Sequence, residues 1–270
     1  MPELIGKDVL YRKWDSAGNK AVLLLVHGMG AHSARWNFAG EYFSQKGFPC
    51  YAIELKGFGQ TPERPRGHVD SFKIYYQDLM KLRAIIEKEH PGRKVFLFAE
   101  SMGGLIAFTL LSQNPYQFAG QILISPAFQN GMKFPISSYL KLILFLIFNR
   151  RGTIEMAFNS AMCTRDLSYQ NVMNNNPDEL RVASAQLLLE VLLAQLGAKR
   201  AGRKINVPSL FLIPGKDYLV DEDFGEEIIS SFQFGDKTII KYPDMLHALS
   251  IELDREKVFA DILSWLETRV

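Results

Sequence analysis

Short apolar runs alternate with helix-like segments along most of this 270-residue chain. The runs lie at 21–26, 49–54, 93–98, 121–124, 208–213 and 237–242. Between them, helices are expected after Asp70-Ser71, over 102–113, near 222–232 and near 254–268. Strands that alternate with helices predict a largely parallel sheet with helices on both faces. Residues 8–14 are expected to pair with 21–26 through a turn at 16–19.

Residues 127–200 interrupt this alternation. They are expected to be helical without strands, and they lie between two strands of the sheet. We therefore expect an α/β core of residues 1–126 and 201–270 and a helical cap of residues 127–200. The run 139–148 is apolar on nearly all sides but too short to span a bilayer. It is either a buried cap helix, with 182–196 packed beneath it, or an exposed lid that contacts membrane or micelle surfaces.

Ser101 lies in the sequence Ala-Glu-Ser-Met-Gly, between an expected strand and an expected helix. A strand, a sharp turn at serine and a helix form the context of a nucleophile elbow. Small residues at Ala99 and Gly103 let the turn close, and the helix N-terminus favours developing negative charge. The pattern predicts that Ser101 is a nucleophile.

A serine nucleophile needs a base and an acid, in the chain order serine, aspartate or glutamate, histidine. Of the five histidines, only His247 follows Ser101. Asp217 comes directly after the apolar run 208–213, at the place expected for the acid. The competing residues are Asp221 and Asp223, at an acidic helix start, and Asp244, too close to His247. The sequence predicts a triad of Ser101, Asp217 and His247.

The oxyanion hole is expected from the backbone N–H groups of Met102 and Met29. Met29 lies in His27-Gly28-Met29-Gly30, after a strand that is apolar throughout. Each such donor contributes about 3–4 kcal/mol of transition-state stabilisation. The alternatives for this turn are an ordinary strand–helix connection or a phosphate cradle, but two glycines match neither nucleotide-binding fingerprint. His27 is expected to pack beneath the hole.

Composition and charge restrict the remaining possibilities. A formal net charge of +2 gives no reason to expect nucleic acid as a partner. Two cysteines cannot form a disulfide framework, and the N-terminus has no hydrophobic signal segment. We therefore expect a cytoplasmic protein that contacts membranes peripherally through the cap. No metal or organic cofactor is expected for serine chemistry.

The chain resembles the monoacylglycerol lipase and lysophospholipase branch of the α/β-hydrolases over most of its length. The resemblance rests on the turn 27–30, the Ser101 elbow, Asp217 with Val220, and His247 with Glu252. The segments 66–72, 123–127 and 163–166 add to it. It implies an α/β-hydrolase fold with a helical cap and hydrolysis of monoacylglycerol or lysophospholipid esters through an acyl-enzyme.

The resemblance suggests His32 and Arg35 as substrate-binding residues, and the apolar cap run suggests Leu144 and Ile147. His32 and Arg35 follow the oxyanion turn, and Leu144 and Ile147 lie in the apolar cap run. Family members often carry Glu-His after the turn, where the glutamate helps to hold a glycerol headgroup, but this chain has Ala31-His32. Alternative functions are a general short- or medium-chain carboxylesterase, an aminopeptidase-type hydrolase with cap carboxylates (Glu155, Glu179 or Glu190) as anchor, and a non-catalytic receptor or scaffold.

Overall fold

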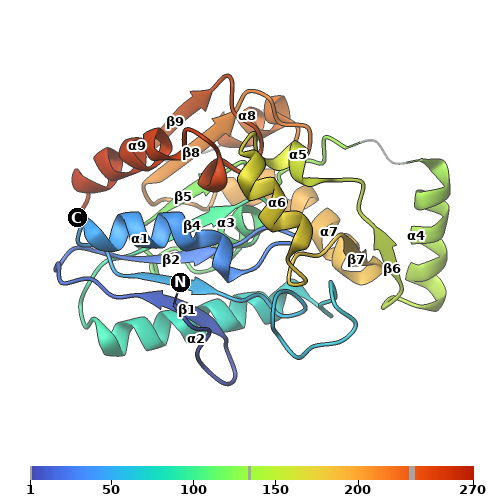
Figure 1. Ribbon diagram of the computed structural model, residues 1–270, viewed down its shortest axis with the longest axis horizontal. Helices are drawn as coiled ribbons and strands as arrows, with labels where there is room; N and C mark the ends of the chain where they lie inside the picture. Colours follow the sequence, from blue (N-terminus) through green and yellow to red (C-terminus); the bar gives the residue numbers. More distant parts are fainter. Residues whose placement is uncertain (1, 133–134, 231–234) are drawn as a thin grey trace.

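The computed structural model describes residues 2–132, 135–230 and 235–270 (Figure 1). The strands are β1 (Tyr11–Trp14), β2 (Val22–Val26), β3 (Cys50–Ile53), β4 (Val95–Glu100), β5 (Gly120–Ile124), β6 (Thr153–Glu155), β7 (Val182–Ser184), β8 (Ser209–Pro214) and β9 (Lys237–Tyr242). The α-helices are α1 (Asn37–Gln45), α2 (Phe72–Glu89), α3 (Met102–Gln113), α4 (Ile136–Phe148), α5 (Ser160–Cys163), α6 (Leu167–Asn175), α7 (Ala185–Gly202), α8 (Glu222–Ser230) and α9 (Arg255–Glu267). The 3-10 helices are η1 (Ser33–Trp36) and η2 (Leu249–Ile251).

Within the described residues, seven strands form one sheet in the order β1-β3-β2-β4-β5-β8-β9. All pairs are parallel except β1 with β3, which confirms the predicted, largely parallel sheet. The expected pairing of residues 8–14 with 21–26 is wrong, because β3 and β4 occupy both edges of β2. The segment instead pairs with the outer edge of β3, with Tyr11 opposite Ile53.

Alternate residues of the central strands enter two hydrophobic cores, one on each face of the sheet. Leu24 and Leu97 face the core beneath α2, α3 and α7, whereas Leu23 and Phe98 face the core beneath α1 and α9. Strands buried on both faces explain why the sequence runs are apolar throughout instead of alternating. The expected helix near 222–232 is α8, and residues 231–232 lie outside the described part of the chain.

The segment 127–200 is not entirely helical, which corrects the expectation. β6 and β7 form a short antiparallel pair in which Ile154 lies opposite Ala183. β6 follows α4 and β7 directly precedes α7, so the pair brings together segments that are far apart in sequence. Strands of three residues are too short to produce a recognisable local sequence pattern. Figure 1 shows α5, α6, α7 and the β6–β7 pair between the sheet and α4, which lies at the far end of the molecule.

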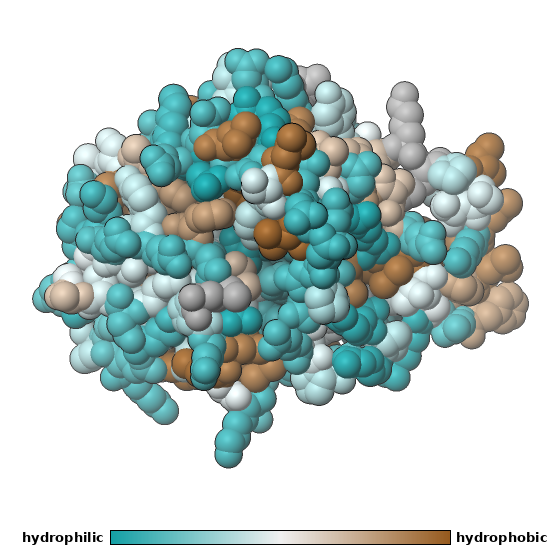
Figure 2. Space-filling model, in the orientation of Figure 1, coloured by the Kyte–Doolittle hydropathy of each residue, from teal (hydrophilic) through white to brown (hydrophobic). Residues whose placement is uncertain are grey.

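Helix α4 is exposed, so the interpretation of the run 139–148 as a buried cap helix is wrong. None of its residues is buried. Figure 2 shows hydrophobic side chains gathered at the end of the molecule where α4 lies. The large exposed side chains of the helix are Ile136, Tyr139, Leu140, Ile143, Leu144, Ile147 and Phe148. In the part of the chain that the structure describes, no helix combines the length and the hydrophobicity needed to cross a bilayer.

Gly103 allows α3 to pack directly against the end of β2. A Cβ at this position would lie 2.4 Å from the carbonyl oxygen of Val26 and 2.5 Å from that of His27. Gly103→Ala is therefore expected to lower the free energy of unfolding by about 1–3 kcal/mol, measured by urea denaturation. Gly197→Ala in α7 is the control, since its Cβ would meet no atom within 4 Å. Alanine there is expected to be neutral or stabilising by up to about 1 kcal/mol. Equal stability of Gly103→Ala and the wild type would contradict this close packing.

Candidate active site

Ser101 occupies a strained turn between β4 and α3. Its backbone has a φ of 57° and a ψ of −123°, a region that non-glycine residues rarely adopt. Hydrogen bonds fix the turn on both sides: the Ser101 N–H donates to the carbonyl oxygen of Ile124 at 2.9 Å, and its own carbonyl accepts from Ala127 N at 3.1 Å. A Cβ at Gly28 would come within 3.0 Å of Ser101 Cβ, so glycine keeps the space beside the serine open.

His247 and Asp217 form a buried pair next to this turn. Nδ1 of His247 lies 2.7 Å from Oδ2 of Asp217, and both side chains are almost completely buried. The other carboxylate oxygen of Asp217 accepts hydrogen bonds from Leu219 N at 2.8 Å and Val220 N at 3.1 Å. Ser125 Oγ donates to the carbonyl oxygen of His247 at 2.6 Å and so fixes the histidine loop. These backbone hydrogen bonds hold the carboxylate of Asp217 in the position from which it contacts the imidazole of His247.

The competing aspartates lie elsewhere. Asp244 is exposed and pairs with Lys216 at 2.9 Å. Asp221 accepts a hydrogen bond from Gln129 at 3.3 Å. The side chain of Asp223 is outside the described part of the structure. Of the carboxylates considered, Asp217 is the one that the structure places in contact with His247.

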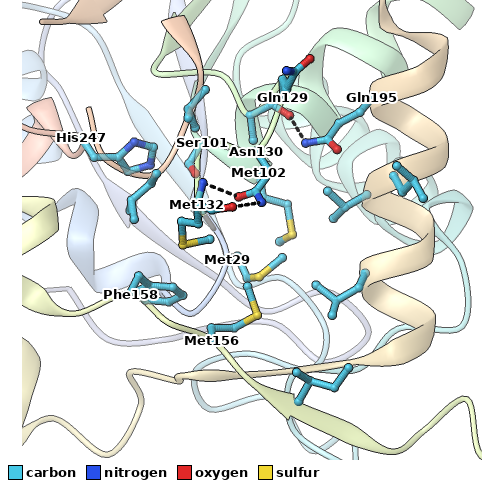
Figure 3. A pocket seen from close by; sticks show the side chains of 18 of the residues that line it. Met29, Ser101, Met102, Gln129, Asn130, Met132, Met156, Phe158, Gln195 and His247 are labelled. Carbon is cyan, nitrogen blue, oxygen red and sulfur yellow. Dashed lines mark hydrogen bonds between the residues drawn. The ribbon is translucent and has the colours of Figure 1, made fainter. Parts of the chain in front are cut away.

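Burial alone would lower the pKa of His247, but the charge and the hydrogen bond of Asp217 outweigh it and raise the pKa above its ordinary value. Since Nδ1 binds Asp217, Nε2 is the nitrogen left to face Ser101. Figure 3 shows the imidazole directed toward Ser101, and both residues line the same cavity. This arrangement suits proton transfer between the serine hydroxyl and Nε2.

Met29 and Met102 lie on the other side of Ser101, and both line the cavity. Met102 is the first residue of α3, where a backbone N–H has no acceptor within the helix. The turn around Met29 is closed by a hydrogen bond from Ala31 N to the carbonyl oxygen of Gly28. His27 lies buried beneath this turn, as expected, and its Nε2 accepts from Leu55 N at 3.0 Å.

The cavity at Ser101 has a volume of about 260 Å³ and is mostly apolar. Figure 3 shows Met29, Met156 and Phe158 on one side and side chains of α7 on the other. Gln129, Asn130 and Gln195 supply polar groups along the wall. The sequence did not single out the methionine lining, because Met29, Met102, Met132 and Met156 come from four separate segments.

The four expected substrate-binding residues occupy different environments. Arg35 lines the cavity, whereas His32 is buried beside Asn176, with 3.0 Å between Asn176 Nδ2 and His32 Nε2. Leu144 and Ile147 are exposed on α4 and are absent from the cavity lining that the described residues form. The helix contributes Ser138, Tyr139 and Leu142 to the cavity instead.

Glu252 connects the histidine loop to the segment 163–166. One of its oxygens accepts from Leu246 N at 3.0 Å and from Arg165 Nε at 3.0 Å, and its side chain is fully buried. In addition, Ala248 N donates to the carbonyl oxygen of Cys163 at 2.8 Å. Glu252 and the segment 163–166 both contribute to the family resemblance in the sequence, but the contact between them is visible only in the structure.

A parallel sheet with helices on both faces and a strand–serine–helix turn is the architecture of the α/β-hydrolases. A family model described as serine aminopeptidase, S33 (Hydrolase_4) matches residues 17–254, and the chain belongs to this family. The match confirms the predicted membership of the α/β-hydrolases.

Relatives named as lipases match the chain over nearly its full length. Human monoglyceride lipase is 29% identical over 280 residues, which cover 100% of this chain and 91% of that protein. Phospholipase YtpA of Bacillus subtilis is 26% identical over 252 residues, covering 91% of this chain and 95% of that protein. The solved monoacylglycerol lipase of Paleococcus ferrophilus shares the fold with a TM-score of 0.86 and 23% identity, covering 99% of this chain and 100% of that one. The predicted resemblance to the monoacylglycerol lipase and lysophospholipase branch is confirmed.

Asp217→Asn is expected to lower the pKa of His247, because asparagine supplies no negative charge. In the wild type the pKa of His247 is expected above 6.5, since Asp217 stabilises the charged imidazole. Stability from this pair is therefore present below pH 6.5 and lost as the pH rises through the raised pKa. NMR titration of the imidazole resonances measures the shift. His27 is the internal reference, since burial lowers its pKa to about 4. An unchanged pKa of His247 in Asp217→Asn would contradict the coupling.

Proposed function

We propose that this protein hydrolyses carboxylic esters of lipids, monoacylglycerols or lysophospholipids, with Ser101 as nucleophile. The observation that carries the proposal is the buried Asp217–His247 pair facing Ser101 at an apolar cavity. The relatives named monoglyceride lipase and phospholipase support the same class of substrate. Residues 127–200 are the proposed cap over this cavity, with the core in residues 1–126 and 201–270.

In the proposed reaction, His247 Nε2 takes the proton from Ser101 Oγ as the oxygen attacks the ester carbonyl. The backbone N–H groups of Met29 and Met102 stabilise the oxyanion of the tetrahedral intermediate. The intermediate collapses, and the protonated imidazole gives its proton to the leaving alcohol. Water then attacks the acyl-enzyme with His247 as base, and the fatty acid leaves. Asp217 keeps the imidazole oriented and stabilises its charged form.

The apolar part of the cavity is the proposed site of the acyl chain. Met156, Phe158, Leu188 and Val191 offer dispersion contacts and no charge. A cavity with this lining favours a lipid over a short ester, which would leave much of the apolar wall unused. A general carboxylesterase is the second candidate function. The acyl-chain length of the preferred substrate distinguishes it from a lipid esterase.

An aminopeptidase is less well supported, although the family model carries that description. Such an enzyme needs a carboxylate that is free to bind a substrate amino group. Glu190 already accepts hydrogen bonds from Ser71 Oγ and Phe72 N at the start of α2, and Glu179 pairs with Arg35. Glu155 is exposed on β6, outside the cavity lining of the described residues. A scaffold without activity is disfavoured because Ser101, Asp217 and His247, the proposed triad, are all present and His247 is paired with Asp217.

Ser101→Ala is expected to reduce kcat by several orders of magnitude, because the acyl-enzyme cannot form. The measurement is the initial rate on monoacylglycerols, lysophosphatidylcholine and p-nitrophenyl esters of increasing chain length. Labelling by a fluorophosphonate probe should occur in the wild type and be lost in the variant. The thermal unfolding temperature controls for folding. Wild-type turnover in Ser101→Ala would overturn the proposed nucleophile, and activity on short esters alone would favour the carboxylesterase.

We further propose that α4 contacts the membrane or micelle that holds the substrate. Removing the exposed side chains of Ile143 and Phe148 by serine substitution is expected to lower activity on vesicle-bound substrate by at least tenfold. A tenfold loss corresponds to about 1.4 kcal/mol, and complete burial of one such side chain contributes about 1.5–3 kcal/mol. Activity on a short soluble ester should not fall. The control is Tyr116→Ser. Tyr116 lies outside the proposed cap and is 87% exposed, so this variant removes a large exposed side chain elsewhere on the surface. Equal losses on both substrates would exclude a role at the membrane surface.

A further inference from the structure

Arg35 and Glu179 form a buried ion pair between the oxyanion turn and the cap. Arg35 Nε lies 2.7 Å from Oε1 of Glu179, and an Nη atom of the same guanidinium donates to Oε2. Their side chains are 8% and 9% exposed. Burial alone would raise the pKa of Glu179, but the charge of Arg35 and the hydrogen bonds of His32 and Arg35 lower it to about 2. His32 Nε2 lies 3.5 Å from Oε1 of Glu179. The pair is therefore fully ionised at neutral pH, with its charges cancelled.

The backbone holds this pair in register. Leu180 N donates to the carbonyl oxygen of Gly30 at 2.8 Å, directly after Glu179. Gly30 has a φ of 77°, and a Cβ there would lie 2.3 Å from the carbonyl oxygen of Leu180. The cap segment thus lies against the oxyanion turn with no space between the two backbones. The position of Glu179 follows from this contact and does not depend on a flexible loop.

Arg35 is the one lysine or arginine in the cavity lining among the described residues. Arg35 lies in η1, which packs against η2, and η2 begins two residues after His247. Arg35, Cys163 and His247 all line the cavity, so the guanidinium lies near the histidine. The backbone N–H of Ala248, next to His247, donates a hydrogen bond to the carbonyl oxygen of Cys163 at 2.8 Å. In serine hydrolysis the histidine protonates the leaving alcohol, so the alcohol lies at this end of the cavity.

We propose that Glu179 determines headgroup selectivity by cancelling the charge of Arg35, so that the site accepts esters of uncharged alcohols and rejects anionic ones. The inference rests on the proposed ester hydrolase function. A phosphate or carboxylate headgroup would lose its hydration and meet carboxylates without an uncompensated cation to pair with. An uncharged hydroxyl avoids this cost. It can also accept a hydrogen bond, since a guanidinium has five N–H donors and Glu179 engages two nitrogens.

The test compares two esters with the same acyl chain, 1-lauroylglycerol and 1-lauroylglycerol 3-phosphate, below their aggregation concentrations. The wild type is expected to prefer the neutral ester in kcat/KM by about a hundredfold. Glu179→Gln keeps the size of the side chain and removes its charge. This variant is expected to reduce the preference about tenfold by raising kcat/KM for the phosphate ester, because the positive charge of Arg35 is then no longer compensated.

Two variants assign the effect to this ion pair. Asp178→Asn removes the same charge from the neighbouring residue, whose carboxylate binds Gln60 at 2.8 Å, and is expected to keep the wild-type preference. Combining Glu179→Gln with Arg35→Gln should restore a strong preference for the neutral ester, since no cation is released. Thermal unfolding and fluorophosphonate labelling report whether each variant is folded with a reactive serine.

Equal kcat/KM for both esters in the wild type would overturn the proposal without any variant. An unchanged preference in folded Glu179→Gln would also overturn it. Where Glu179→Gln does not fold, the wild-type preference decides alone. Failure of the lipid proposal has a different signature, which is no turnover of either lauroyl ester. The comparison then uses 1-butyrylglycerol and its 3-phosphate, which test headgroup charge independently of acyl length.

Discussion

Ser101 holds a positive φ at the end of β4, a conformation that costs a non-glycine residue about 1–3 kcal/mol. The surrounding backbone maintains it, because hydrogen bonds from Ser101 to Ile124 and from Ala127 to Ser101 leave the turn no alternative. Gly28 and Gly103 supply the space that the turn and the start of α3 require. The position of Ser101 at the cavity and the orientation of the first N–H of α3 both follow from this turn.

The parallel sheet brings the remaining groups to the same place. Strands β2, β4 and β8 run in the same direction, so the segments that follow them meet at one edge of the sheet. These segments carry Met29, Ser101 and Asp217. β9 is parallel to β8, and the loop after it carries His247. Residues more than a hundred positions apart therefore need only short loops to come into contact, and short loops anchored on buried strands keep their geometry.

This explains what the sequence could and could not predict. The order serine, aspartate, histidine and the apolar runs before each residue are local signals, and they led to Asp217 among four candidates. The pairing of β1 with β3 and of β6 with β7 depends on which strand edges remain open, which no local pattern records. Likewise, Ala31 indicated that the glutamate common in the family is missing near Arg35. The carboxylate that pairs with Arg35 is that of Glu179, 144 residues further along the chain, which no local pattern indicates.

The segment 127–200, the proposed cap, is attached to the rest of the chain beside Ser101 and His247. Arg165 and Glu252 join it to the loop of His247, and Glu179 and Arg35 join it to η1, which follows the turn 27–30. Both pairs bury a carboxylate, so breaking either would leave a charge without its partner, at a cost of about 3–5 kcal/mol. Helix α4 has no buried residue and no such pair in the described structure. A lid movement that admits substrate would therefore cost least at α4, whereas the segments that orient His247 and neutralise Arg35 would stay in place.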